Sequence, residues 1–152
     1  MTEQAEPDNF LPKLRNALNG FSPTPVCWAV LSAGKEMDEQ LGHLTDWVNW
    51  LVDRYALDHR TVPPCWDQHG AALEELSALR TAWITAHSGD SLGDAPLRWH
   101  AEFAFARQRL NDWVARTGCR PGEHRDGQMK ASSVPASPRC PPLSPNQPVP
   151  AS

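Results

Sequence analysis

A helical repeat of apolar residues between positions 41 and 55 constrains the fold of this chain more than any other feature. The repeat consists of residues separated by steps of three or one: Leu41, Leu44, Trp47, Val48, Leu51, Val52 and Tyr55. This spacing matches the 3.6-residue period of an α-helix, so one face of the helix needs an apolar partner. Pro63 and Pro64 follow, and proline ends helices because it lacks the backbone N–H donor.

Two further stretches repeat the same pattern. The second helix is expected from about residue 67 or 70 to residue 87, with an apolar side made of Leu73, Leu76, Leu79, Trp83 and Ala86. The third is expected from Asp94, a good N-cap, to Gly118, a good C-cap. Its apolar residues are Trp99, Phe103, Ala106, Leu110, Trp113 and Val114. Three amphipathic helices with short connections predict an all-α fold, an antiparallel three-helix bundle.

The bundle is predicted to occupy residues 35–125. Residues 1–34 form a flexible leader in this interpretation, with a short helix that begins after Asn9 and ends at Gly20. Residues 126–152 are rich in proline and serine and contain little that could be buried, so we expect a disordered tail.

The chain contains seven tryptophans, an unusual number for so small a core. Trp47, Trp83 and Trp113 each lie on an apolar stripe and are expected to pack in the interior. Trp50 lies off the stripe of its helix, which leaves open an exposed position; an exposed Trp50 would mark a contact surface.

Composition narrows the class of protein. The first six residues are polar and acidic, unlike a secretory signal, and the longest apolar run, 26–31, is too short to cross a membrane. We therefore expect a cytoplasmic protein without a membrane segment. Its four cysteines favour thiols or metal ligands over disulfides in that compartment.

Two Cys/His pairs form the sharpest chemical signal. Cys65 and His69 precede or begin the second helix, and Cys119 and His124 follow the third. In an up-down-up arrangement these two segments lie at the same end of the bundle. Two thiolates and two imidazoles are a ligand set for a closed tetrahedral Zn²⁺ site, so the spacing predicts a structural zinc ion.

Other interpretations of these residues stay open. Cys65 and Cys119 could be small buried apolar residues beside two solvent-facing histidines. Cys65 could also be a nucleophile with His69 as its base, although the sequence offers no third orienting group. His59 lies at the same end and is a spare ligand. No residue is assigned a catalytic role.

A basic bias along the last helix suggests a second kind of partner. Arg109, Arg116 and Arg120 fall roughly on one side of this helix and its extension, where they could contact the phosphates of a nucleic acid. Acidic residues interrupt this side, and the net charge of the chain is −4.

Several segments of the chain carry a family resemblance. They are Trp47 to Tyr55, Pro63 to Trp66 with His69, Glu74 to Leu79, Trp99-His100, Arg109 to Trp113, and Thr117 to Cys119 with His124. In these features the chain resembles a family of uncharacterised small helical actinobacterial proteins, often encoded on plasmids, phages and integrated elements. The resemblance covers about half of the chain and implies a mobile-element origin and a domain of unknown function, with no catalytic residue to carry over.

These observations lead to an ordered set of functional hypotheses. The first is a non-catalytic interaction module, stabilised by zinc, that binds a protein partner or a second copy of itself. The second is a nucleic-acid-associated accessory protein that uses the arginine side of the last helix. The third is a thiol-dependent enzyme.

Overall fold

The structure, a computed structural model, describes residues 24–31 and 33–125. Within these residues the chain forms three α-helices, α2 (Lys35–Tyr55), α3 (Gly70–Ala86) and α4 (Ala95–Thr117), and one 3₁₀ turn, η2 (Trp66–Gln68). The described part contains no β-strand, only an isolated bridge between Arg120 and Glu123. The predicted all-α architecture with three helices is therefore confirmed. Most of the predicted leader and the predicted tail lie outside the described residues.

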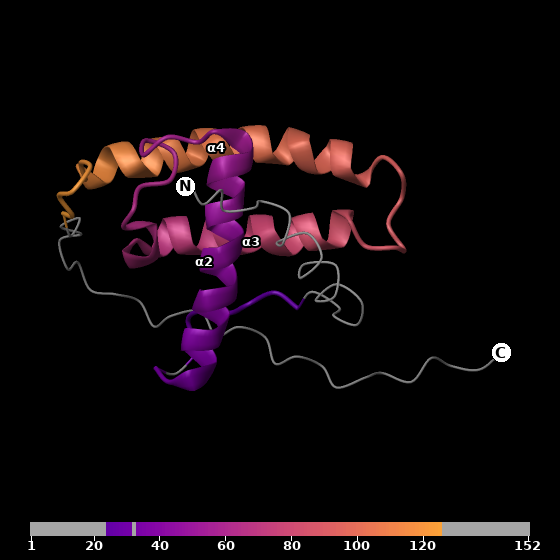
Figure 1. Ribbon diagram of the computed structural model, residues 1–152, viewed down its shortest axis with the longest axis horizontal. Coiled ribbons are helices and arrows are strands. Elements are labelled where there is room, and N and C mark those ends of the chain that lie inside the picture. Colours follow the sequence, from indigo (N-terminus) through magenta and orange to yellow (C-terminus); the bar gives the residue numbers. More distant parts are fainter. Residues whose placement is uncertain (1–23, 32, 126–152) are drawn as a thin grey trace, which may run out of the picture.

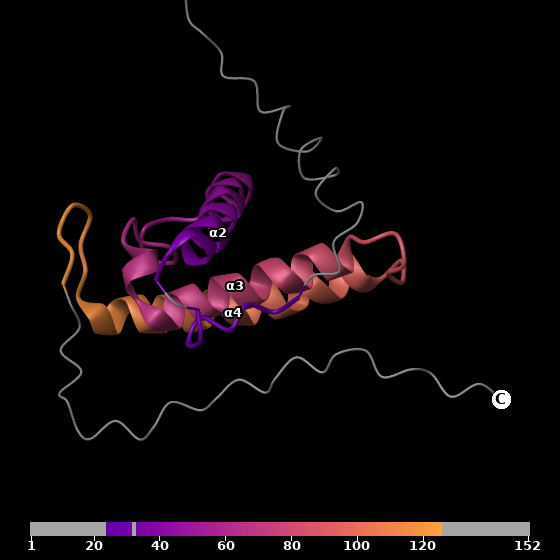
Figure 2. The ribbon, with the colours of Figure 1, turned by 90° about the horizontal axis from the view of Figure 1, so that it is seen from below.

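The helices differ in how they pack. Helices α3 and α4 run antiparallel side by side, while α2 crosses them steeply (Figures 1 and 2). The indole N–H of Trp99 on α4 donates a hydrogen bond to the backbone oxygen of Leu79 on α3, at 3.1 Å. At the end of α2, the hydroxyl of Tyr55 lies 2.9 Å from Nε2 of His100 on α4. The crossing therefore brings the end of α2 to the first half of α4.

The interior is built from the predicted apolar stripes. The most deeply buried large side chains come from all three helices: Leu44, Trp47, Val48, Leu51, Leu76 and Leu110. Trp83 is also buried, and Trp113 is half-buried against the core. Trp50, for which an exposed position was left open, is half-buried against the core. Its ring packs edge-on against Trp83, with the ring centroids 5.0 Å apart, because the steep crossing turns this side of α2 toward α3.

The helix ends show one success and one correction for the sequence analysis. Gly118 ends α4 in the left-handed conformation, with φ 69°, as a C-cap glycine should. Asp94 occupies the N-cap position but makes no capping hydrogen bond. Its carboxylate instead pairs with the guanidinium of Arg98 one turn later, at 3.0 Å.

The connection between α2 and α3 lies along the second half of α4. Oδ1 of Asp58 accepts hydrogen bonds from the backbone N–H groups of Arg60 and Thr61, which shapes the loop. The hydroxyl of Thr61 then donates to Oδ1 of Asn111 on α4, at 2.8 Å. This contact fixes the connection near the C-terminal end of α4, where Cys65 and His69 follow.

Candidate metal centre

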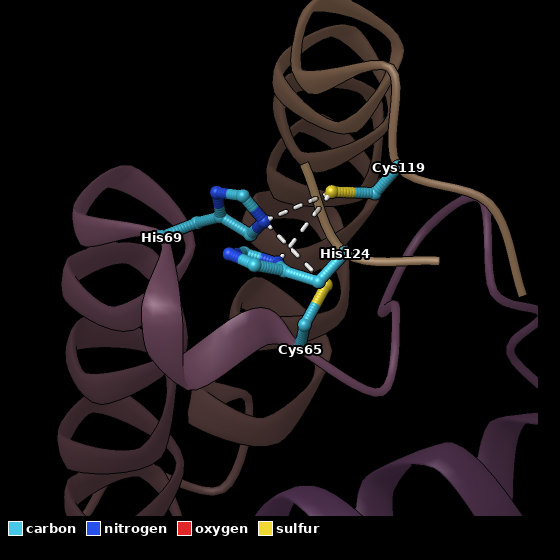
Figure 3. A group of neighbouring side chains, drawn as sticks. All are labelled: Cys65, His69, Cys119 and His124. Carbon is cyan, nitrogen blue, oxygen red and sulfur yellow. Dashed lines mark hydrogen bonds between the residues drawn. The ribbon is translucent and has the colours of Figure 1, made fainter. Parts of the chain in front are cut away.

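The first half of the site is built around η2. The backbone N–H of Gln68 bonds to the oxygen of Cys65, and that of His69 bonds to the oxygen of Trp66. Trp66 is only 7% exposed, so its ring anchors this turn in the core. Cys65 and His69 flank the buried tryptophan and lie on the same side of the turn (Figure 3).

The second half of the site is a tight turn after α4. Arg120 and Glu123 exchange both backbone hydrogen bonds, at 3.0 and 2.9 Å, around Pro121 and Gly122. Gly122 has φ 78°, and proline followed by a glycine with positive φ is typical of a type II turn. The turn reverses the chain and returns His124 to Cys119.

The four side chains converge although the two halves are about fifty positions apart (Figure 3). Their ligand atoms all lie within 4.8 Å of one another. Nε2 of His69 is 3.5 Å from Sγ of Cys65 and 3.3 Å from Sγ of Cys119, which in turn lies 3.8 Å from Nδ1 of His124. Zinc–sulfur and zinc–nitrogen bond lengths give tetrahedral edges of about 3.3–3.8 Å between the donor atoms. The three distances given above fall in this range, and the remaining pairs lie within 4.8 Å, so four ligand atoms surround a space that a metal ion could occupy.

The two thiols differ in acidity. Burial, followed by the neighbouring sulfur of Cys119, raises the pKa of Cys65. Burial also raises the pKa of Cys119, but hydrogen-bonding contacts with Thr117, the Arg125 backbone and His69 outweigh it and lower this pKa to about 6. The backbone N–H of Arg125 lies 3.3 Å from Sγ of Cys119 and stabilises the thiolate. Cys119 is thus the thiol prepared to act as a ligand.

The sequence analysis missed the residues that support Cys119. The backbone N–H of Cys119 donates to the hydroxyl of Thr117, at 3.2 Å, and this hydroxyl donates to the oxygen of Val114, at 2.7 Å. Thr117 therefore links the ligand to the last turn of α4. A threonine two residues before a candidate ligand, next to a C-cap glycine, was the available signal.

Cys27 and His59 do not belong to the cluster. Cys65 and Cys119 are free thiols, as expected, whereas Cys27 is disulfide-bonded, which corrects the prediction for that cysteine. Among the described residues, the Cys/His cluster is the one group of three or more such side chains with the spacing of metal ligands.

The three arginines predicted to contact nucleic acid have different surroundings. Arg109 forms a two-pronged ion pair with Glu75 of α3, with contacts of 2.6 and 3.2 Å. Arg116 is exposed on the last turn of α4. Arg120 lies beyond the helix, in the tight turn. Only Arg109 and Arg116 therefore lie on α4 itself, and Arg109 is already paired with Glu75.

Comparisons with known proteins add no further assignment. No protein-family model matches the chain, and searches of curated proteins and of solved structures found no match. The resemblance to the mobile-element family therefore stays a prediction. No helix in the described part of the chain is long and apolar enough to cross a membrane.

Proposed function

We propose that this protein is a non-catalytic interaction module whose α4 end is held by a structural Zn²⁺ ion. The ligands are Cys65, His69, Cys119 and His124. The observation that carries the proposal is the convergence of their four ligand atoms within 4.8 Å, with three of the distances at 3.3–3.8 Å, the length of a zinc tetrahedron's edges.

The ligand set favours a structural role for the metal over a catalytic one. Four protein side chains fill a tetrahedral shell, whereas catalytic zinc keeps a position open for water or substrate. The third hypothesis, in which Cys65 is a nucleophile, is disfavoured by its raised pKa, since the thiolate is the reactive form. Two thiolates also balance the charge of Zn²⁺, which suits a partly buried site.

The metal would fix a segment that buries little apolar surface of its own. In the segment after α4, residues 120–125 are all exposed. A metal shared with Cys65 and His69 would fix this segment to the α2–α3 connection, which is itself bound to α4 through Thr61. The surface around the site would then be rigid enough for specific recognition.

Metal content of untagged protein, measured by mass spectrometry, tests this proposal. We expect about one zinc ion per folded chain, lost in Cys65→Ser and in Cys119→Ser. His59→Gln changes a histidine at the same end that lies outside the cluster, so this control should keep its zinc. Less than about a tenth of an equivalent in folded wild-type protein would exclude the site.

The melting temperature gives a second readout that does not depend on the folding of variants. Because zinc binds the folded chain, a strong chelator should lower the melting temperature of the wild-type protein. Restored zinc should reverse the change. If the chelator leaves the melting temperature unchanged, zinc has no structural role in this protein.

The interaction part of the proposal includes self-association or binding to a protein partner. Leu92, Leu97 and Phe105 are exposed apolar side chains on or beside α4, at 68%, 73% and 61%. They offer contact area to a second chain. Sedimentation velocity at rising concentration tests self-association, and Phe105→Ser should weaken any dimer. A species that stays monomeric throughout would leave only a different protein as the partner.

The cytoplasmic location stays a prediction, and a reducing compartment would keep both ligand thiols available.

A further inference from the structure

A cleft of about 790 Å³ opens beside the Cys/His cluster. Three segments form it: the α2–α3 connection, the second half of α4, and the turn that follows α4. Figure 1 shows this connection passing beside the last turns of α4. Ligand-binding clefts in proteins commonly measure about 300–1,000 Å³, so the cleft has the size of a small-molecule site.

The charge of the cleft is opposite to that of the chain. Arg60, Arg107, Arg120 and Arg125 line it, and among the described residues of its lining Asp58 is the one carboxylate. The chain as a whole has a net charge of −4. A local concentration of guanidinium groups in an acidic protein favours one class of ligand, an anion.

Most of these arginines are available to a ligand. Arg125 pairs with Glu123, at 3.0 Å. The ion pairs within residues 24–31 and 33–125 do not include Arg60, Arg107 or Arg120. The guanidinium of Arg107 lies over the ring of Phe103, 5.8 Å from its centroid, which holds it in place.

The other polar groups of the cleft leave hydrogen-bond donors for a ligand. Oδ1 of Asp58 is already engaged by the backbone N–H groups of Arg60 and Thr61. The Thr61 hydroxyl lies closer to Oδ1 of Asn111, at 2.8 Å, than to Asp58, at 3.5 Å, so its proton goes to Asn111. The amide NH₂ of Asn111 has no hydrogen-bond partner in the part of the chain that the structure describes.

We propose that this cleft binds a phosphate group. Arginines from three separate segments surround one space, which suits an anion with several acceptor oxygens and more than one negative charge. A ligand with a single carboxylate group would pair with only one of these guanidinium groups. The phosphate belongs either to a small phosphorylated molecule or to a nucleic-acid backbone, since both present the same group to the protein.

The proposed phosphate site does not require the zinc ion. Arg60 and Arg107 lie on the α2–α3 connection and on α4, which are joined by the bond between Thr61 and Asn111. Only Arg120 and Arg125 lie on the segment that zinc would fix. Phosphate binding and zinc content are therefore separate measurements, and either one can fail without the other.

Isothermal titration of the full chain with inorganic pyrophosphate tests the site. We expect saturable binding of one pyrophosphate per chain, weakened about tenfold or more in Arg60→Gln and in Arg107→Gln because each loses a charge-assisted hydrogen bond. Arg116→Gln is the matched control. This substitution also removes one positive charge from α4, but residue 116 lies outside the cleft. The variant should therefore bind pyrophosphate with the affinity of the wild type.

A second titration, with a short DNA duplex, identifies the source of the phosphate. If the duplex competes with pyrophosphate, and if its affinity falls steeply as salt is added, the site binds a nucleic-acid backbone. Pyrophosphate binding that the duplex does not displace assigns it to a small phosphorylated molecule. The proposal is overturned if neither probe binds saturably, or if Arg116→Gln weakens binding as much as the two cleft variants. Circular dichroism of each variant confirms that it is folded.

Discussion

The helical interior and the metal pole, which comprises residues 61–69 and 117–125, are stabilised in different ways. In the interior, residues such as Trp47, Leu76 and Leu110 are at most 1% exposed and come from three different helices. In the metal pole, Arg120 to Arg125 are exposed and are ordered by a tight turn and by contacts to the sulfur of Cys119. The interior can therefore form by burial of apolar area alone. In the metal pole, residues 61–69 share this burial through Val62 and Trp66, whereas residues 117–125 depend on a few specific bonds.

This difference separates two kinds of perturbation. Loss of apolar volume should reduce the stability of the whole chain, because all three helices share one core. Loss of the metal should act first on the metal pole and leave the packing of the interior in place. The following predictions would break or sharpen that distinction.

The largest effect is expected in the interior. Leu110 on α4 is fully buried, so Leu110→Ala should lower the free energy of unfolding by about 2–5 kcal/mol. Zinc content per folded chain should stay unchanged. Chemical denaturation measures the first quantity and mass spectrometry the second. Leu97→Ala, at a position 73% exposed on the same helix, is the control and should change stability by less than about 0.5 kcal/mol. Equal effects at both positions would mean that the helix faces are assigned incorrectly.

The next effect comes from the metal. With free zinc at 100 times its dissociation constant, chelation should remove about 2.7 kcal/mol of stability. Hydrogen exchange then locates the change. The amides of Arg120 and Glu123, which bond to each other's carbonyls, should lose protection, while the amide of Leu110 in the core should keep it. A uniform loss of protection would show that the metal pole and the interior unfold as one unit.

A smaller effect is expected from the turn that carries His124. Gly122 has φ 78°, which costs an L-residue about 1–2 kcal/mol, so Gly122→Ala should weaken zinc binding by about tenfold. Gly89→Ala is the control, because a Cβ there meets nothing within 4 Å and the backbone has no positive φ. Competition with a chromogenic chelator measures both affinities. Equal zinc affinity in the two variants would show that the conformation of the turn does not contribute to metal binding.

The last prediction concerns the reactivity of the two cluster thiols. In zinc-free protein, hydrogen bonds that outweigh burial lower the pKa of Cys119 to about 6, while burial raises that of Cys65. Cys119 is mostly thiolate at pH 7, so iodoacetamide should label it with half-maximal rate near pH 6 and label Cys65 only in alkaline solution. A depressed pKa also stabilises the fold above the pKa of the unfolded thiol, and this contribution is lost as pH falls through about 6. Peptide mapping at pH 5 to 9 checks the order, and faster labelling of Cys65 at pH 7 would contradict it.

The helices were predictable because their information is local. Apolar periodicity, proline and the C-cap glycine at position 118 located α2, α3 and α4 to within a few residues. The direction of α2 was not predictable, because the crossing depends on how aromatic side chains of different helices fit together. Trp50 is an example, since its place off the α2 stripe left its exposure open and its contact with Trp83 depends on the crossing.

The candidate site was partly predictable for the same reason. Each Cys/His pair is local in sequence, and the order of the helices was enough to place both pairs at one end. The arginine prediction had no such support. The partner of Arg109 is Glu75, on a neighbouring helix, and Arg60 joins Arg107 in the cleft only because Thr61 bonds to Asn111. Contacts between distant segments decide which charges remain available, and sequence periodicity contains no information about them.

A metal bound between the two halves of the site would also have a topological consequence. A metal that joins His69 to Cys119 closes a ring containing all of α3 and α4, while α2 lies outside it. In a chain-entropy treatment, a cross-link over a ring of about fifty residues removes roughly 4 kcal/mol of freedom from the unfolded chain. The α3–α4 hairpin would therefore resist separation while the ion stays bound. Helix α2 could detach without opening the ring, so it is the element expected to leave first when the molecule is heated or pulled.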